Sequence, residues 1–342
     1  MVKRALIFLF FLIVIGVVYL YFPHKTQKLI YFPKKSNPLF KEYLLMQDTS
    51  LNSFDIYFLK QLDIKPGWIR VEKEVNKLDI MKLAQAKKSE KTRIMVAYGG
   101  ENIDDFFTQI AKQANLNQEK LKEIFNKKAL FDNASILAKK YHIPYRVDEG
   151  SVLNYMLANT LESYKKIAKE NNISISSDSF YKKIVVASII QKETSSAKEM
   201  PLIASVIYNR LKNDLKLQMD ATLNYGKHSH TIITPKMIRE DNSKFNTYKF
   251  KGLPPKPLAM VTINALEAAF NPKESEYLYF VKRGKSHIFS KNYKKHKKRV
   301  AIYKKSLVTK RLIKKEFRKV AYIFSKNLKP TIFTLYLPIK TK

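Results

Sequence analysis

The stretch Lys182–Gly226 reads KKIVVASIIQKETSSAKEMPLIASVIYNRLKNDLKLQMDATLNYG. It opens on an apolar run that a single carboxylate, Glu193, closes. The run is apolar nearly all round, which predicts a buried helix that begins at Phe180 with Asp178 or Ser179 as its cap. Glu193 follows two isoleucines by three and four residues, so it lies on an apolar face close to the helix C-terminus. We expect the rest of the chain to be organised around this carboxylate.

The position of Glu193 suits one kind of chemistry, although this residue taken alone favours a structural role. Burial and the negative end of the helix dipole both disfavour a carboxylate anion. Both therefore favour the protonated acid, which can donate a proton as a general acid in glycosidic bond cleavage. A helix-end glutamate paired with Lys192 or Lys198 is the structural alternative. Glu199 is a rival carboxylate, but its loop-like context predicts that it is solvated.

A second amphipathic pattern, LIASVIYNRL at Leu202–Leu211, predicts another helix, which ends in Asn209 and Arg210. This pair could bind a carboxylate or sugar hydroxyls, and Arg210 could equally be a surface residue. Leu217–Thr222 then predicts a short strand that carries polar groups. No set of His, Asp and Glu has the spacing of metal ligands, so we expect neither a metal nor another cofactor.

Composition narrows the class of protein. The chain has 342 residues, enough for one anchored catalytic domain and one or two small modules. A formal net charge of +35 fits a polyanionic partner such as nucleic acid, anionic lipid or an acidic cell-wall polymer. A lysine-rich proteome would give the same excess without any partner. The chain has no cysteine, which excludes thiol catalysis, disulfides and Cys-based metal sites.

The N-terminus carries an unbroken apolar run, Ala5–Phe22, without a charge. Its length falls at the short end of a bilayer span, roughly 17–25 residues. Lys3 and Arg4 favour a cytoplasmic location for residues 1–4. A cleaved signal peptide is the alternative, but no small-x-small cleavage site follows the run. We expect an uncleaved single-pass anchor in the inner (cytoplasmic) membrane with an extracytoplasmic, periplasmic body, which argues against a nucleic-acid partner.

The next part of the chain is a mixed juxtamembrane and accessory region at residues 23–91, where Val71–Leu83 has helical spacing. Residues 92–170 are expected to hold a strand at Thr92–Tyr98 and two helices, the first capped by Asn102. This strand, helix, helix order resembles the LysM-like module that binds amino-sugar glycans. A generic β-α-α unit fits the same residues.

A second strand, Tyr141–Val147, and a helix from Val152 towards Lys169 are predicted after that module. The polar connector Asn171–Ser177 then marks the start of the region expected to carry the chemistry, residues 171–306. Residues 307–342 form a densely basic C-terminal extension.

That extension predicts an amphipathic helix, Val308–Phe324, and a last strand, Ile332–Leu337. The helix could lie on anionic lipid, grip the acidic peptide stems of a cell wall, or pack on the domain with a solvated face. The sequence does not distinguish these three positions of the helix.

Several motifs occur in a fixed order along the chain. They are KET after ASII, VIYNRL, LQMDATLNYG, FNTY at 245–248, GLPPKPL at 252–258, ALEAAFNP at 265–272, YLYFV at 277–281 and HIFS at 287–290. The series resembles the YceG-like family of endolytic murein transglycosylases, of the MltG type, over roughly 181–300. The resemblance implies an α+β fold: an N-terminal transmembrane helix, a small LysM-like β-α-α module and a mixed α/β catalytic domain.

The resemblance also implies an activity. The enzyme would cleave the MurNAc-GlcNAc bond of peptidoglycan glycan strands and leave 1,6-anhydroMurNAc ends. The family's catalytic glutamate corresponds to Glu193, which would act as general acid and then as base while the sugar's own 6-hydroxyl attacks. The family usually has a second glutamate two residues earlier, and this chain has Gln191 there. Termination of growing strands and association with peptidoglycan synthases follow as family-level expectations.

Polar residues of the motif set are expected to form the substrate-binding groove: Asn209, Arg210, Gln218, Asp220, Thr222, Asn246, Thr247, Tyr248 and His287. Asp220 could act near Glu193 or make a structural hydrogen bond, and His287 could instead be a core or capping histidine. Leu253-Pro254-Pro255 would be a rigid wall of the groove. Two other functions fit parts of the sequence: a non-catalytic peptidoglycan-binding scaffold with the same groove, and a basic nucleic-acid-binding protein.

Overall fold

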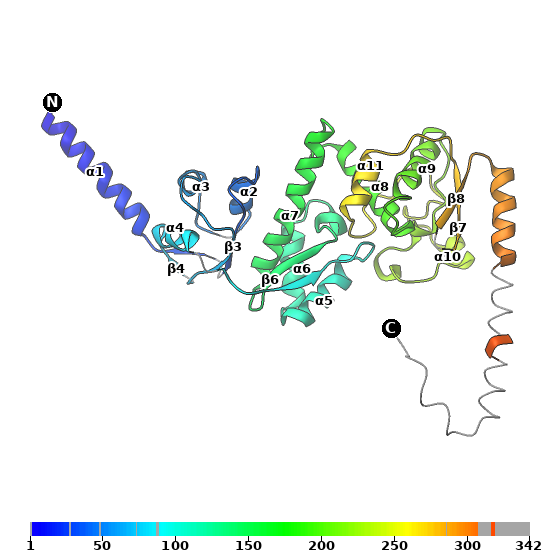
Figure 1. The fold of residues 1–342 in the computed structure, drawn as a ribbon, viewed down its shortest axis with the longest axis horizontal. Coiled ribbons are helices and arrows are strands. Elements are labelled where there is room, and N and C mark those ends of the chain that lie inside the picture. Colours follow the sequence, from blue (N-terminus) through cyan, green and yellow to red (C-terminus); the bar gives the residue numbers. More distant parts are fainter. Residues whose placement is uncertain are drawn as a thin grey trace, which may run out of the picture. The chain divides into compact units, whose positions relative to one another are not determined.

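The computed structural model describes residues 2–26, 29–47, 49–72, 74–86, 89–284, 286–306 and 316–318. The chain divides into two compact units, Met1–Glu274 and Ser275–Lys342. Helices alternate with small two-stranded antiparallel sheets, so the predicted α+β class is confirmed (Figure 1). The predicted strand Ile332–Leu337 and nearly all of the predicted helix Val308–Phe324 lie outside the described residues.

The N-terminal apolar run forms one helix, α1 (Val2–Tyr21). Its apolar side chains are exposed along most of its length. Within the part of the chain that the structure describes, the segment Lys3–Tyr21 of this helix is the one long and apolar enough to cross a membrane. The helix is therefore compatible with the predicted single-pass anchor.

The accessory region combines two short sheets with three helices. The sheets are β1 (His24–Lys25) with β4 (Glu74–Val75), and β2 (Leu29–Phe32) with β3 (Gly67–Arg70); the helices are α2 (Phe40–Leu45), α3 (Ser53–Leu59) and α4 (Lys77–Gln85). Ile30, Phe32, Phe40 and Leu44 are among the buried residues of its core. The helical prediction for Val71–Leu83 is wrong in its first half.

The reason lies at the N-terminus of α4. Residues 74–75 pair with β1 in an extended conformation, and the Asn76 side chain then accepts a hydrogen bond from Asp79 N at 2.8 Å. This cap ends the extended segment and starts the helix one residue later.

Residues 92–144 form a β-α-α-β module. Its elements are β5 (Thr92–Val96), α5 (Ile103–Ala114), α6 (Gln118–Lys128) and β6 (Lys140–Pro144), and β5 pairs with β6 antiparallel. Asn102 caps α5, Asn115 ends it in the left-handed region at φ 54°, and Asn117 caps α6. Both predicted strands and both predicted helices are thus confirmed, with shifted ends.

The long helix α7 (Glu149–Glu170) follows the module, starting earlier than predicted because Asp148 caps it by accepting from Ser151 N at 2.9 Å. The 3-10 helix η1 (Asp132–Ser135) lies between α6 and β6. The polar connector after α7 is confirmed as a turn, and Ser177, not Asp178 or Ser179, caps the next helix by accepting from Phe180 N at 3.1 Å. That helix, α8 (Asp178–Glu193), therefore starts at Asp178 and not at Phe180.

The rest of the first unit is built around α8. Its elements are α9 (Met200–Lys212), η2 (Asp220–Leu223), η3 (Gly226–His228), α10 (Pro235–Glu240) and α11 (Ile263–Phe270). α8 packs against α9, α11 and η2, and its apolar side chains from Ile184 to Ile190 are fully buried or nearly so. The helix predicted at Leu202–Leu211 is confirmed as α9.

The strand predicted at Leu217–Thr222 is wrong. Gln218 adopts a left-handed backbone, φ 52°, which breaks an extended segment, and the chain turns into η2 two residues later. Gln218 N donates to Thr247 O at 3.1 Å and Met219 N donates to Thr247 Oγ1 at 3.2 Å. These bonds hold the segment against the 245–248 turn in place of a sheet partner.

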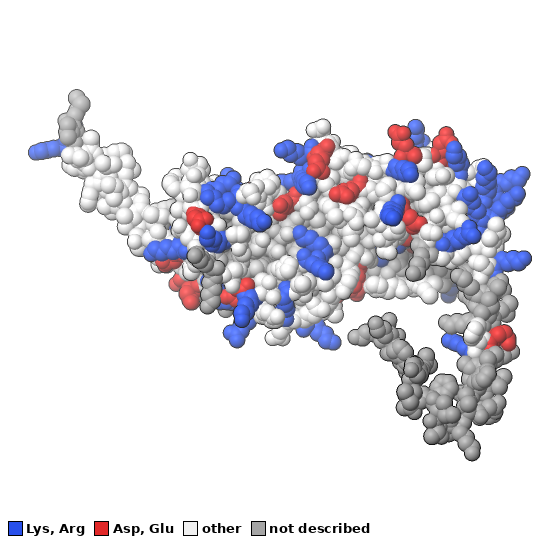
Figure 2. All heavy atoms as spheres, in the orientation of Figure 1, with Lys and Arg blue, Asp and Glu red and all other residues white. Residues whose placement is uncertain are grey.

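The second unit contains an antiparallel hairpin, β7 (Tyr279–Arg283) with β8 (Ser286–Ser290), followed by a helix at residues 293–306. Arg299 fastens that helix to the hairpin, because its guanidinium donates to Phe289 O and, at 2.9 Å, to Ser290 Oγ. Residues 291–306 contain no Asp or Glu, and Figure 2 shows Lys and Arg gathered over this helix. The basic character expected of the C-terminal part thus begins within the described residues.

Candidate active site

Glu193 is the last residue of α8, and its side chain is half-buried. The helix ends there because Thr194 is extended, while its N–H still donates to Ile190 O at 3.1 Å. The buried run before Glu193 fixes the helix in the core, so the carboxylate emerges from a rigid element at the edge of that core. The sequence predicts this position correctly.

The residues just before Glu193 fasten the end of α8 to three other segments. Gln191 is buried, and its Oε1 accepts from Thr262 Oγ1 at 2.6 Å and from Thr262 N at 3.1 Å. Lys192 Nζ donates to Gly100 O at 3.0 Å and to Ser229 Oγ at 3.0 Å. Burial lowers the pKa of Lys192 to about 8. The backbone just before Glu193 is therefore fixed by hydrogen bonds to three segments that are distant in the sequence.

A tyrosine-aspartate pair lies within electrostatic reach of Glu193. Tyr248 Oη donates to Asp220 Oδ1 at 2.6 Å. Burial, then the hydrogen bond and charge of Asp220, then the charge of Glu193 raise the pKa of Tyr248 above its usual range, while Arg210 acts in the opposite direction. Tyr248 is therefore a neutral hydroxyl donor near neutral pH, and two carboxylates approach it from different segments.

Arg210 connects α9 to the same cluster. Its side chain is buried, its Nη2 donates to Gln218 Oε1 at 2.6 Å, and its Nε donates to Lys216 O at 2.8 Å. The surface alternative for Arg210 is therefore wrong. Gln218 itself is exposed, and Asn209 is half-buried one residue earlier on α9. Asp220 and Gln218 present the most accessible polar side chains of the cluster.

Three of the predicted groove residues lie inside the loops. Thr222, Asn246 and Thr247 are almost completely buried. Thr222 Oγ1 and Thr247 Oγ1 are 2.9 Å apart, and Asn246 Nδ2 donates to Ile238 O at 2.9 Å and Asp241 O at 2.8 Å. Asn246 Oδ1 accepts from Tyr248 N at 3.1 Å. Their positions suit them to shape the loops that carry Tyr248 and Asp220, and not to contact a ligand.

The remaining predicted residues lie elsewhere. His287 belongs to β8 in the second unit, where its ring packs edge-on against Phe280 at 5.4 Å. Pro254 and Pro255 line an open pocket beside the N-terminal half of α8, at the other end of the helix from Glu193. Glu199 accepts from Thr194 Oγ1 at 3.3 Å and is half-buried, so it is only partly solvated.

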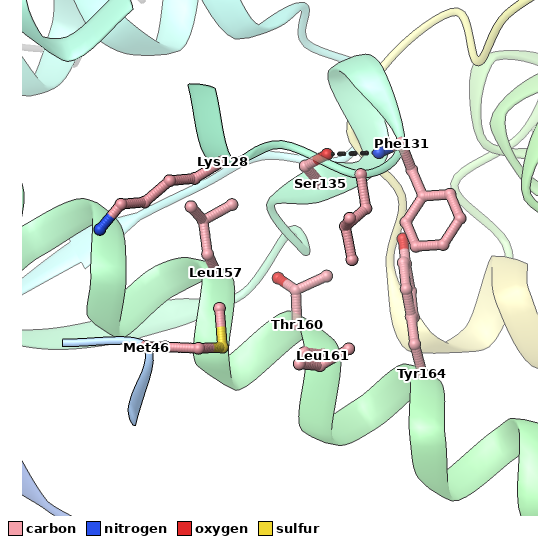
Figure 3. A pocket seen from close by; sticks show the side chains of 9 residues that line it. Met46, Lys128, Phe131, Ser135, Leu157, Thr160, Leu161 and Tyr164 are labelled. Atoms are coloured by element: carbon pink, nitrogen blue, oxygen red, sulfur yellow. Dashed lines mark hydrogen bonds between the residues drawn. The ribbon is translucent and has the colours of Figure 1, made fainter. Parts of the chain in front are cut away.

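The sequence predicts neither the bonds of Lys192 to Gly100 and Ser229 nor a role for the Gly99-Gly100 pair. The signal for the second was present, since two glycines after a strand indicate a close backbone approach. A small, separate pocket beside α7 is lined by Met46, Lys128, Leu130, Phe131, Ser135, Leu157, Thr160, Leu161 and Tyr164 (Figure 3). It contains none of the predicted site residues. Among the described residues, no group of three or more His, Asp or Glu is placed to hold a metal ion.

The contact between Gly99 and Gln191 gives a testable prediction. A Cβ at Gly99 would lie 2.7 Å from Gln191 Cδ and Nε2, so Gly99→Ala must displace that side chain from Thr262. We expect a loss of roughly 1–3 kcal/mol in unfolding free energy, measured by denaturant unfolding. Gln191→Ala removes the clash, and Gly99→Ala should then cost far less in that background. An equal cost in both backgrounds would contradict the explanation.

Comparison with known proteins gives a consistent set of similarities. The model of the YceG-like family matches residues 35–302. The endolytic murein transglycosylase of Bacillus subtilis (strain 168) is 37% identical over 141 residues, which cover 40% of this chain and 37% of that protein. That of Streptococcus pneumoniae (strain D39) is 31% identical over 149 residues, 41% of this chain and 26% of that protein. The chain thus spans well under half the length of these relatives.

A solved structure extends the similarity at the level of the fold. The crystal structure of a yceG-like protein from Listeria monocytogenes has a TM-score of 0.50 with this chain at 24% sequence identity. The similarity covers 79% of this chain and 97% of that one. It therefore concerns most of the described elements and not the catalytic segment alone.

Proposed function

The chain belongs to the YceG-like family, and on that premise we propose that it is a membrane-anchored endolytic lytic transglycosylase acting on peptidoglycan glycan strands. Glu193 protonates the glycosidic oxygen between MurNAc and GlcNAc, and the bond to MurNAc C1 breaks. The resulting carboxylate then takes the proton of the MurNAc 6-hydroxyl as that oxygen attacks C1. The products are a GlcNAc hydroxyl end and a 1,6-anhydroMurNAc end, and no water is consumed.

One observation carries this proposal. Glu193 stands at the end of a buried helix, within electrostatic reach of a tyrosine-aspartate pair contributed by two motif loops. A lytic reaction needs one carboxylate that acts twice, whereas hydrolysis uses a pair of carboxylates on opposite sides of the bond. Asp220 is occupied by Tyr248 and suits electrostatic stabilisation of the positive charge that develops at C1. Gln191 occupies the place of the family's other glutamate and bonds to Thr262.

The exposed or half-buried members of the cluster are the proposed substrate contacts: Asn209, Gln218, Asp220 and Tyr248. Arg210, Thr222, Asn246 and Thr247 support them from inside the loops. In this arrangement the sugar ring meets side chains fixed by internal hydrogen bonds, so little ordering entropy is lost on binding.

Tyr248→Phe tests the tyrosine-aspartate pair. The substitution removes the hydroxyl that donates to Asp220 at 2.6 Å and leaves the ring in place. A hydrogen bond to a charged group contributes about 1.5–3 kcal/mol, so we expect product release to slow by roughly 10- to 100-fold. Tyr225→Phe is the matched control, because Tyr225 Oη donates to Ser243 at 3.0 Å instead. Equal losses in both variants would indicate a general effect on the loops.

The β5–β6 module is the proposed LysM-like part, and we propose that it guides the glycan strand towards Glu193. The Gly99-Gly100 turn at the end of β5 contacts Gln191 and accepts from Lys192, which supports a groove continuous with the site. Ile94 and Tyr98 are exposed on the module and suit the apolar faces of sugar rings.

Localisation follows from α1 and the charges that flank it. We propose a single-pass anchor in the cytoplasmic membrane, with residues 1–4 in the cytoplasm and everything after residue 22 outside it. Termination of growing strands, together with peptidoglycan synthases, is the proposed role at that surface. Periplasmic activity of a reporter fused after Lys342 is the expected result, and a cytoplasmic C-terminus would contradict this topology.

Mass spectrometry of muropeptides tests the reaction itself. Purified sacculi digested with the full chain should yield fragments that end in 1,6-anhydroMurNAc. Reducing ends in their place would indicate hydrolysis. Binding to sacculi without any released fragment would indicate the non-catalytic scaffold, and either result would overturn the proposal.

A further inference from the structure

We propose that the outward face of α3, formed by Phe54, Tyr57 and Phe58, lies in the headgroup region of the membrane that α1 enters. These three residues are called the α3 aromatic face below. The inference rests on the anchor proposed above and goes beyond it, because it gives the folded body a second contact with the bilayer.

The first observation is that α3 carries aromatic rings on its outward face, although its other face already packs into the accessory core. Asp55, Ile56 and Leu59 are buried in the accessory core. The α3 aromatic face points the other way, with 62%, 64% and 46% of the three residues exposed. Ring centroids of Phe54 and Phe58 are 4.7 Å apart, and those of Tyr57 and Phe58 are 5.8 Å apart. A cluster of touching, exposed aromatic rings is typical of an interaction surface.

The second observation is that α3 is bonded directly to the end of α1. Tyr19 Oη donates to Asp55 Oδ1 at 2.8 Å and accepts from Asn52 Nδ2 at 2.7 Å. Lys77 Nζ lies 3.7 Å from the centre of the Tyr19 ring. Asn52 is the N-cap of α3 and Asp55 completes its capping box, so these bonds fix the start of α3 to the last turn of α1.

The location of Tyr19 in α1 sets the depth of the contact. Tyr19 is two residues from the end of the helix, which is about 3 Å along its axis. A spanning helix would bring this turn to the boundary between hydrocarbon and headgroups, and aromatic side chains concentrate at that level. Figure 2 shows α1 without charged residues between its N-terminal end and this junction.

The chemistry of the α3 aromatic face favours lipid over a protein partner. Tyr21 and Phe22 at the end of the apolar helix are exposed as well, and Tyr19 of the same turn is bonded to the start of α3. Tyr57 supplies a hydroxyl to an otherwise apolar face, the combination that suits an interface. Exposed Lys60 follows α3 and can reach lipid phosphates.

Site-directed spin labelling tests the proposal cleanly, because the chain has no cysteine. Three single-cysteine variants of the full chain, Ile13→Cys, Tyr57→Cys and Ser176→Cys, carry a nitroxide in phosphatidylcholine–phosphatidylglycerol nanodiscs. Ile13 is exposed on α1, and Ser176 is exposed in the connector after α7. The measured quantity is how often oxygen and a water-soluble nickel complex collide with each label.

At position 13 we expect oxygen collisions to exceed nickel collisions several-fold, at position 176 we expect the reverse, and at position 57 we expect a ratio clearly between these two limits. A lipid-buried label at 13 with a water-exposed label at 57 would overturn this inference and leave the anchor intact. A water-exposed label at 13 would overturn the anchor itself. Strong broadening of the nitroxide spectrum at position 57 would show that the labels of two molecules lie close together. The aromatic face would then bind a second copy of the chain, which would also overturn the lipid contact.

Discussion

Glu193→Gln is expected to abolish the release of anhydromuramyl fragments from purified sacculi. The amide has the shape of the carboxylic acid but cannot deliver a proton to the glycosidic oxygen or take one from the 6-hydroxyl. Proton transfer by a positioned side chain contributes about 10²- to 10⁴-fold to a rate. Because this reaction uses the group twice, we expect a loss at the upper end of that range.

The fold should tolerate this substitution. Glu193 is half-buried at the end of α8, and the packing of that helix depends on the apolar residues before it. The matched control is Glu199→Gln, which changes the rival carboxylate six residues later and keeps an acceptor for Thr194. Full activity in the control and none in Glu193→Gln is the expected pair of results. Unchanged activity in Glu193→Gln would exclude the assigned catalytic role.

The helices and the position of Glu193 at the end of a buried helix could be predicted because their signals are local. The buried run before Glu193, the amphipathic pattern of α9, and caps such as Asn102 and Asn117 each depend on a few neighbouring residues. The ordered motifs then linked Glu193 to its family, which periodicity alone does not do. Local physics also predicts the module's strands, although not which of them pair.

The contacts that position the site could not be predicted, because they join residues far apart in the chain. Gln191 meets Thr262, and Lys192 meets Gly100 and Ser229; the Gly99-Gly100 pair indicates a close backbone approach, but no local pattern shows which residues approach it. The strand predicted at Leu217–Thr222 is wrong for a similar reason, because the backbone at Gln218 depends on a distant partner. A left-handed glutamine is uncommon, and it is stabilised here by bonds to Thr247 from a distant turn.

The ion pair between Lys77 and Asp55 also joins residues that lie far apart in the sequence. It gives the prediction with the largest effect on the free energy of unfolding. Lys77 Nζ and Asp55 Oδ2 are 2.8 Å apart, and their side chains are only 3% and 1% exposed. Burial would lower the pKa of Lys77, but the hydrogen bonds with Asp55 and Tyr19 and the charge of Asp55 outweigh it, so the pKa is raised. Lys77 is thus held charged inside the protein at neutral pH, in contact with the Asp55 carboxyl group.

Lys77→Met should lower the unfolding free energy by about 3–5 kcal/mol, because it leaves a buried carboxylate without its counter-charge. Tyr19 and the Asn52 backbone N–H still donate to Asp55, which favours the lower end of that range. Denaturant unfolding in detergent, followed by the fluorescence of the single, buried Trp68, measures the change. Lys82→Met on the same helix is the control, since its pair with Asp79 is 4.0 Å long and exposed.

The partner substitution separates the charge effect from simple loss of packing. Asp55→Asn keeps an oxygen that can accept from Asn52 N and removes the charge, so the Lys77→Met/Asp55→Asn variant contains no unpaired buried ion. We expect this double variant to be more stable than Lys77→Met alone, whereas independent packing losses would make it less stable. The exposed control should change stability by about 0.5 kcal/mol or less. Because Tyr19 belongs to the same cluster, the Lys77→Met variant should also loosen the junction between α1 and α3, which a nitroxide at position 57 would detect as increased mobility.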